Sequence, residues 1–126
     1  MTESEQTRTF CRQLRQAGCI VINYVGNVRQ GSGWPDRWIG SPKWAGWIEF
    51  KAEKGKLSVL QYIAIKMLNT VRPGEACVLR FIGTGKDKQY RLETYDGTEI
   101  QTVSTPVDIL DVLANWREKQ KQLRQV

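Results

Sequence analysis

Two carboxylates and one lysine stand at positions that suit metal-dependent chemistry. Asp36 follows a proline at the start of one predicted strand, and Glu49 and Lys51 lie two residues apart on the next. Side chains alternate between the two faces of a strand, so Glu49 and Lys51 share one face while Phe50 points into the core. If the strands pair as a hairpin, Asp36 comes close to Glu49. The two carboxylates then form an oxygen-rich site for a hard divalent cation, Mg²⁺ or Mn²⁺.

The repulsion between these carboxylates favours a bound ion. Two like charges about 4 Å apart repel by about 4 kcal/mol at an effective dielectric constant of about 20, and a divalent ion turns that repulsion into attraction. Lys51 offsets part of the repulsion without the metal. The same residues also allow an interpretation without chemistry, in which Asp36 caps a turn and Glu49 pairs with Lys51 across the strand surface. From these residues alone, both interpretations stay open.

The elements that must position these side chains follow from periodicity and turn residues. An antiparallel hairpin is predicted over 34–39 and 44–51, with a four-residue connection at 40–43. Amphipathic helices are predicted over 2–17, which Gly18 ends, and over 58–69. The second helix carries Leu60, Ala64, Met67 and Leu68 on one face. Further strands are predicted over 19–25, as a buried strand, and over 76–82 and 89–95, and a last helix opens at Pro106 and fades into a basic tail over 117–126.

This order predicts an α/β protein with a central mixed β-sheet flanked by helices. The arrangement is an α-β-β-β-α-β core with a C-terminal hairpin strand and helix. Because 126 residues are the size of one domain, we expect a single domain over 1–126.

The motif residues and their surroundings resemble a known nuclease family. Pro35-Asp36 followed by Glu49-Phe50-Lys51 matches the PD…(D/E)XK signature. The wider runs 31–36, 47–52 and 55–61 resemble the virus-type replication-repair nuclease (VRR-NUC) family, over residues 3 to about 82. The resemblance implies a restriction-endonuclease-like fold in which Asp36 and Glu49 bind the metal. It also implies that Lys51 acts on the attacking water and the scissile phosphate, and the backbone carbonyl of Phe50, between the motif side chains, is an expected further ligand.

Two further site residues follow from the resemblance. The family has a glutamate on the first helix and a glutamine at the start of the second, which by position resemble Glu5 and Gln61. Glu3 competes with Glu5, and counting back from Gly18 favours Glu5. Gln61 has a structural alternative, because Ser58 and Gln61 have the spacing of a capping box.

The charge balance favours a polyanionic partner. Lys and Arg number 19 against 13 Asp and Glu, a formal net charge of +6. Five tryptophans cluster mostly around the hairpin, where they suit stacking on bases or, more simply, packing in the core or in a dimer interface. The basic residues expected to contact nucleic acid are Arg29, Arg37, Lys43, Lys54 and Lys56.

Composition excludes several other classes of function. Histidine is absent, which removes Ser-His-Asp triads, imidazole zinc sites and any histidine base. Three cysteines without a CxxC spacing build neither a disulfide framework nor a four-cysteine zinc site. No organic cofactor is expected, and without an apolar run of membrane-spanning length we expect a cytoplasmic protein of a bacterial or phage-infected cell.

The sequence therefore predicts a metal-dependent, structure-selective DNA endonuclease. The resemblance implies a homodimer that acts on branched DNA such as Holliday junctions. The competing hypothesis is a non-catalytic nucleic-acid-binding module with the same fold, and the intact trio of Asp36, Glu49 and Lys51 argues against it.

Overall fold

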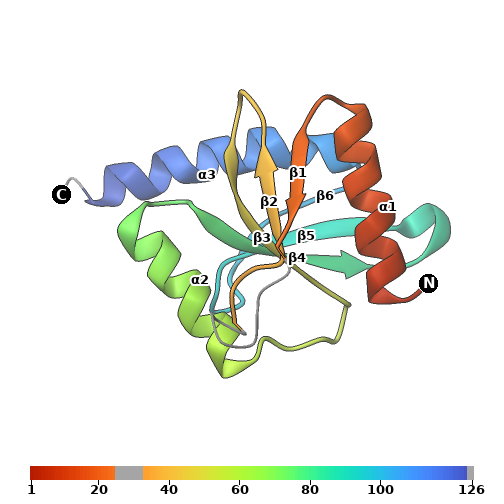
Figure 1. Ribbon diagram of the computed structural model, residues 1–126, viewed down its shortest axis with the longest axis horizontal. Helices are drawn as coiled ribbons and strands as arrows, with labels where there is room; N and C mark the ends of the chain where they lie inside the picture. Colours follow the sequence, from red (N-terminus) through yellow and green to blue (C-terminus); the bar gives the residue numbers. More distant parts are fainter. Residues whose placement is uncertain (25–32, 125–126) are drawn as a thin grey trace.

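A mixed, open β-sheet organises the chain in the computed structural model, which describes residues 1–24 and 33–124 (Figure 1). Its six strands lie in chain order, and every neighbouring pair is antiparallel except β3 and β4. The strands are β1 (Ile20–Asn23), β2 (Arg37–Gly40), β3 (Ala45–Lys51), β4 (Ala76–Ile82), β5 (Gln89–Glu93) and β6 (Glu99–Val103). The prediction of an α/β protein with a mixed sheet is confirmed.

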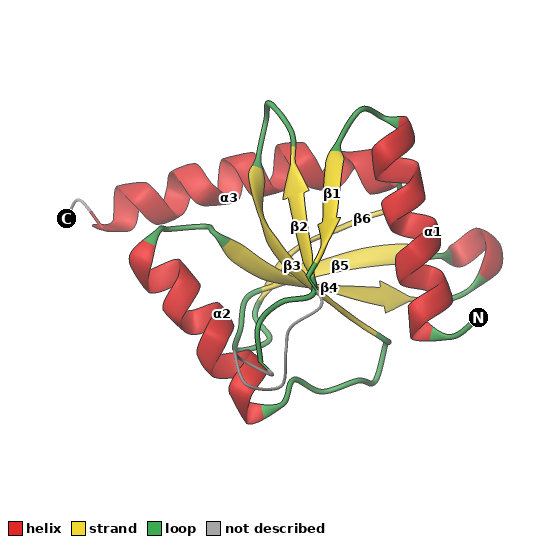
Figure 2. Ribbon diagram, viewed as in Figure 1, coloured by secondary structure: helices red, strands yellow, loops and turns green. Residues whose placement is uncertain are grey.

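Three α-helices flank the sheet (Figure 2). They are α1 (Glu3–Gln16), α2 (Val59–Val71) and α3 (Ile109–Arg124), and short 3-10 turns cover Gly85–Asp87 and Pro106–Asp108. The larger core lies on the face under α1 and α3, and a smaller one joins Ile65 of α2 to Ala76 and Val78 of β4. The parallel step from β3 to β4 requires a crossover, which α2 provides. None of the helices described here is long and apolar enough to cross a membrane.

The predicted hairpin of β2 and β3 is confirmed. Arg37 pairs with Ile48 and Trp38 with Trp47, and a four-residue connection, residues 41–44, joins the strands. Ser41 closes this connection, because its hydroxyl donates to the carbonyl of Trp44 at 2.7 Å and its main-chain N–H donates to the same oxygen at 3.1 Å. The register of the hairpin therefore sets Asp36, the residue before β2, opposite Glu49 near the end of β3.

The prediction of a buried strand over 19–25 is wrong in its burial. Strand β1 lies at the edge of the sheet, and of its four residues only Val21 is buried. Ile20 and Ile22 are 61% and 52% exposed. Helix α1 covers the face that carries Val21, whereas α2 packs on β4, so within residues 1–24 and 33–124 no helix covers the second face of β1. An apolar, β-branched run therefore forms an exposed edge strand.

The helices begin close to the predicted residues, but α2 buries a different face. Thr2 caps α1, and Gly18 follows that helix with a φ of 96°. In α2 only Ile65 is buried; of the residues expected on the inner face, Leu68 packs half-buried beside it, while Leu60 and Met67 are exposed. The cause is the narrow contact of α2 with β4, which one side chain and its half-buried neighbours fill.

The predicted basic tail over 117–126 continues α3 as far as Arg124, but its first residue is not solvated. Arg117 is anchored rather than solvated: its Nε donates to the carbonyl of Gly74 at 3.1 Å, and its guanidinium lies 5.2 Å from the ring centroid of Trp44. Arg124 donates to the carbonyl of Asn69 at 2.8 Å, at the end of α2. The C-terminal helix thereby ties the end of α2 to the start of β4.

Candidate active site

The two predicted metal ligands lie together at one end of the β2–β3 hairpin. Asp36 immediately precedes β2, and the hairpin register carried one step past Arg37 and Ile48 sets Asp36 opposite Glu49. Glu49 is buried, with 5% of its surface exposed, and Asp36 is half-buried. The charge of Asp36 contributes to the raised pKa of Glu49. The hairpin therefore brings the carboxylates together, as the sequence predicted.

Burial dominates the ionisation of this pair. It raises the pKa of Glu49 from 4.5 to about 8, with a further contribution from Asp36, and Lys51 lowers that pKa in part. Burial also raises the pKa of Asp36, against the charge of Arg37, whose Nη1 lies 3.3 Å from Asp36 Oδ2. Desolvated carboxylates near neutral pH are typical of sites that hold a cation or do acid–base work.

One carboxylate oxygen has no partner. Asp36 Oδ1 is one of two buried side-chain N or O atoms, among the described residues, that make no hydrogen bond. A buried carboxylate oxygen without a partner costs free energy of about 1–3 kcal/mol. This atom is therefore chemically suited to a cation.

The backbone carbonyl of Phe50 points toward the β2 side of β3, where Asp36 lies. The N–H of Trp47 donates to the carbonyl of Glu75 beside β4 at 2.8 Å, so the peptide groups of Trp47, Glu49 and Lys51 point toward β4. Peptide groups alternate along a strand, so that of Phe50 points toward the β2 side. Strand β2 begins only at Arg37, opposite Ile48, so it provides no ladder partner for the carbonyl of Phe50.

The donor set is small. Within residues 1–24 and 33–124 no group of three or more His, Cys, Asp or Glu side chains is arranged to hold a metal ion. The two carboxylates and the Phe50 carbonyl fit a hard cation such as Mg²⁺ that keeps several water ligands, and they do not fit a fully protein-enclosed ion.

Lys51 lies on the same face of β3 as Glu49, as alternation predicted. Its positive charge lowers the pKa of both Asp36 and Glu49. It is half-buried and precedes the loop 52–57 that leads to α2. An ammonium group therefore stands beside the carboxylates without forming a close ion pair with either among the described contacts.

Gln61 makes the contacts of both alternatives that the sequence left open, the capping box and a hydrogen bond to Glu49. Its Oε1 accepts from the N–H of Ser58 at 2.9 Å and its own N–H donates to Ser58 Oγ at 3.1 Å, which completes a capping box. Its Nε2 donates to Glu49 Oε1 at 3.4 Å. The first turn of α2 is therefore both capped and joined to the carboxylate site.

On the first helix, Glu3 rather than Glu5 lies at the site, which corrects the sequence expectation. Glu3 Oε2 accepts from the N–H of Ala52 at 3.2 Å, and its charge raises the pKa of Asp36 and Glu49. Glu5 is exposed and lines a shallow hollow with Met1, Arg8, Thr9 and Arg12. Residues two apart on a helix point about 200° apart, so only one of the two glutamates can face the site.

The basic residues separate into three groups. Lys54 and Lys56 are exposed on the loop after β3, beside the site. Arg37 is paired with Asp36, and Lys43 lies in the hairpin connection, paired with Asp111 of α3 at 3.0 Å. Four residues of β3, 45–48, separate Lys43 from Glu49, at least about 13 Å along the strand, so Lys43 is not part of the site. Arg29 lies outside the described residues.

An aromatic cluster beside Asp36 contains two of the hairpin tryptophans and Tyr24, which the sequence did not single out. The rings of Tyr24, Trp34 and Trp47 meet edge to face or tilted, with centroids 5.6–6.5 Å apart. The N–H of Tyr24 donates to the carbonyl of Asp36 at 2.8 Å. Trp34 is partly exposed, whereas Trp44 and Trp116 are buried. Packing in the cores therefore accounts for three of the five tryptophans, because Trp47 packs against the smaller core.

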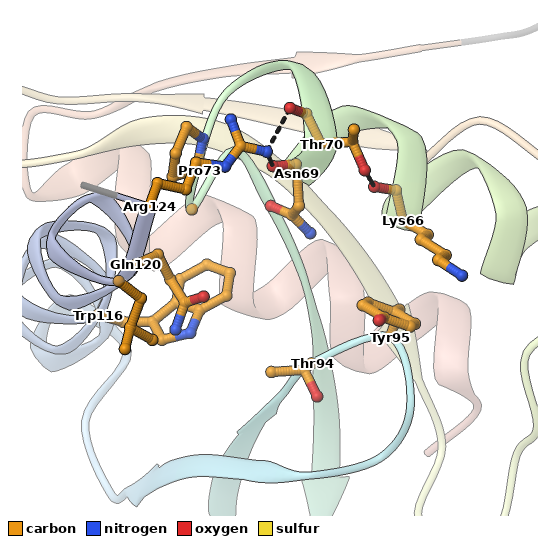
Figure 3. Close-up of a pocket in the computed structure, with 11 residues that line it drawn as sticks. Lys66, Asn69, Thr70, Pro73, Thr94, Tyr95, Trp116, Gln120 and Arg124 are labelled. Carbon is orange, nitrogen blue, oxygen red and sulfur yellow. Dashed lines mark hydrogen bonds between the residues drawn. The ribbon is translucent and has the colours of Figure 1, made fainter. Parts of the chain in front are cut away.

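A separate cavity of about 270 Å³ lies between α2 and α3 (Figure 3). None of Asp36, Glu49 and Lys51 lines it. Its most basic group, Arg124, is engaged with the last carbonyls of α2. The cavity is therefore distinct from the carboxylate site.

In metal-free buffer, we expect Glu49→Gln to be more stable than the wild type at about pH 8 and no more stable at about pH 4. The pKa of Glu49 in the folded chain is raised to about 8 from 4.5, so the unfolded chain loses a proton that the folded chain keeps between these values. Wild-type stability then falls with rising pH across this window, by up to about 1.4 kcal/mol per pH unit. Urea unfolding at a series of pH values measures the difference, and parallel curves for the two proteins would contradict it.

The sequence matches no protein-family model and no curated protein. Any functional assignment therefore depends on the residues and their geometry.

Proposed function

We propose that the protein is a metal-dependent DNA endonuclease with a restriction-endonuclease-like fold. The observation that carries this proposal is the unpartnered, buried Asp36 Oδ1 beside a second buried carboxylate, Glu49, and the ammonium of Lys51. This arrangement suits the sequence pattern that resembles the VRR-NUC family. The fold supports the proposal, because the β2–β3 hairpin, the crossover helix and the parallel β4 have the order that the resemblance implies.

The residues divide the chemistry among them. Asp36, Glu49 and the Phe50 carbonyl would hold Mg²⁺ or Mn²⁺, and the ion, when bound, polarises the phosphate and makes a bound water more acidic. Lys51 is placed to orient the attacking water or to stabilise the charge that develops on the phosphate. Gln61 orients Glu49, and Glu3 holds the peptide that follows Lys51. Hydrolysis needs no covalent intermediate on the protein.

Branched DNA is the substrate class that we propose. Lys54 and Lys56 extend from the loop beside the site, and the chain carries a net charge of +6. Such contacts bind phosphates and respond to the shape of the backbone rather than to base edges. The second candidate, a nucleic-acid-binding module without turnover, would use the same basic loop but would gain nothing from two desolvated carboxylates.

We also propose that the active form is a homodimer joined through α2 and not through the hairpin tryptophans. Val59, Ile63, Met67 and Val71 are exposed at intervals of four residues, which places them in one stripe along α2. Lys66 is the single charged residue of this helix. Like charges oppose association elsewhere on a chain of net charge +6, so an apolar helix face is the surface best suited to a second copy.

Asp36→Asn and Glu49→Gln should each abolish cleavage of a labelled four-way junction in Mg²⁺ or Mn²⁺, because each removes a ligand charge at nearly constant volume.

Lys51→Ala should lose catalysis more than metal affinity, since a charged lysine does not ligate the ion. Glu3→Gln should slow cleavage, and Glu5→Gln is the matched control on the same helix. Duplex, flap, single-stranded and RNA substrates assayed alongside identify the preferred class. Wild-type activity in the Asp36 and Glu49 variants would refute the site, and binding without cleavage by the wild type would favour the module.

Affinity for junction DNA should fall steeply with salt. If about six phosphates are neutralised, the slope of log K against log salt is near −5. Replacing Lys54 and Lys56 together by glutamine should make the slope shallower by about two units. The paired replacement of Lys119 and Lys121, on the exposed side of α3, is the control and should change it little. A slope near zero, or one sequence preferred across junction shapes, would show that base contacts dominate.

Light scattering should give about twice the chain mass of 14.5 kDa at micromolar concentration. Met67→Glu should yield the monomer, because it buries a charge in the α2 interface. Val107→Glu, at an exposed valine away from α2, should remain dimeric. A monomeric wild type, with and without DNA, would refute the assembly.

A further inference from the structure

One side chain of β4, Arg80, holds the main chain of the loop that follows β3, and the N–H of Gly83, just after β4, donates to Glu53 Oε1 of the same loop at 2.9 Å. Arg80 donates from Nη1 to the main-chain carbonyls of Ala52 at 2.9 Å, of Glu53 at 3.3 Å and of Gly55. Carbonyls from a four-residue stretch therefore converge on one guanidinium nitrogen. Arg80 is also the register partner of Lys51 in the parallel pair of β3 and β4. The contacts of Arg80 with the loop, which we call the clamp, therefore begin beside Lys51 of the candidate site.

A buried carboxylate aims this guanidinium. Arg80 Nε donates to both oxygens of Glu93, at 3.2 and 3.3 Å, and Glu93 is 5% exposed. Because a guanidinium is planar, a contact that fixes Nε also fixes the direction in which Nη1 points. Arg91 Nε lies 2.7 Å from the same carboxylate. Glu93 therefore keeps a positive partner when Arg80 is replaced, and the fold is expected to survive the change.

The clamped loop connects three groups of the candidate site. It begins at Lys51, its first peptide N–H donates to Glu3, and it ends at Ser58, the cap of the helix turn in which Gln61 donates to Glu49. The side chain of Arg80 is 16% exposed and turned toward the protein. Its donors serve main-chain carbonyls and Glu93, so its effect on the site is indirect.

We propose that Arg80 is a positioning residue, which with Glu93 fixes residues 52–55 and thereby sets Lys51 and Gln61 relative to the two carboxylates. The kinetic part of this proposal rests on the proposed nuclease function. The mechanical part, the hold on the loop, does not. A displacement of about 1 Å at a reacting group can cost about 100-fold in rate, so a clamp of this kind affects turnover without touching the substrate.

The test compares Arg80→Gln and Arg80→Lys with Arg91→Gln. Arg91 shares Glu93 but otherwise pairs with Glu99 and donates to Gly97 in the β5–β6 turn, so its replacement is the matched control. Both Arg80 variants should lower kcat by about tenfold or more while Mn²⁺ affinity by calorimetry stays near the wild-type value. Lysine does not rescue, because one ammonium cannot reach Glu93 and the loop carbonyls together. Wild-type kcat in Arg80→Gln, or equal losses in Arg91→Gln, would overturn the proposal.

A double variant separates positioning from general stability. If Arg80 acts through Lys51, Arg80→Gln combined with Lys51→Ala should be no slower than Lys51→Ala alone, whereas independent effects would multiply. Hydrogen exchange provides a readout that needs no activity. The N–H of Gly55, which donates to the carbonyl of Ala52 at 3.0 Å, should exchange faster in Arg80→Gln than in Arg91→Gln. Unchanged exchange would overturn the clamp, and an inactive wild type with faster exchange in Arg80→Gln would instead reject the nuclease function alone.

Discussion

The desolvation of two neighbouring carboxylates is the constraint around which the rest of the site is arranged. Glu49 lies on a strand that is paired on both sides, and the hairpin sets Asp36 next to it, so neither charge is well hydrated. The surrounding cations, Lys51 and Arg37, compensate only in part, because the pKa values of both carboxyls remain raised. Natural proteins keep such unfavourable pairs where function requires them, which is why we propose that a bound cation balances these carboxylates.

The hairpin and the motif positions could be predicted from the sequence because their signals are local. Alternation decides that Glu49 and Lys51 share a face, and the turn residues between the two strands fix their register. Ser58 and Gln61 likewise form a capping box through residues only three apart. Wherever a side chain is placed by its own strand or turn, composition and spacing were enough.

The rest depends on contacts between distant elements, which one sequence does not encode in a readable pattern. Glu3 faces the site because of the angle at which α1 crosses the end of β3, and counting along the helix cannot set that angle. The apolar residues of α2 fit more than one inward face, and the choice of Ile65 follows from its packing on β4. Lys43 was grouped with the site because it lies among the tryptophans of the hairpin, although the hairpin carries it to the opposite end of β3. Arg80 has no local signal at all, since the loop carbonyls that it binds lie 25 to 28 residues earlier in the chain.

The two side-chain contacts of Gln61 connect the order of the first turn of α2 with the ionisation of Glu49. One amide group closes the first turn of α2 through its oxygen and meets Glu49 through its nitrogen. A hydrogen bond to an ionised carboxylate is about twice as strong as one to a neutral carboxyl, so any ligand that keeps Glu49 ionised also tightens the start of the helix. By the same linkage, a helix whose first turn is open offers Glu49 one donor fewer and binds that ligand less well. Local order at α2 and occupancy of the carboxylates are therefore cooperative, although the helix itself contributes no charged group to the pair.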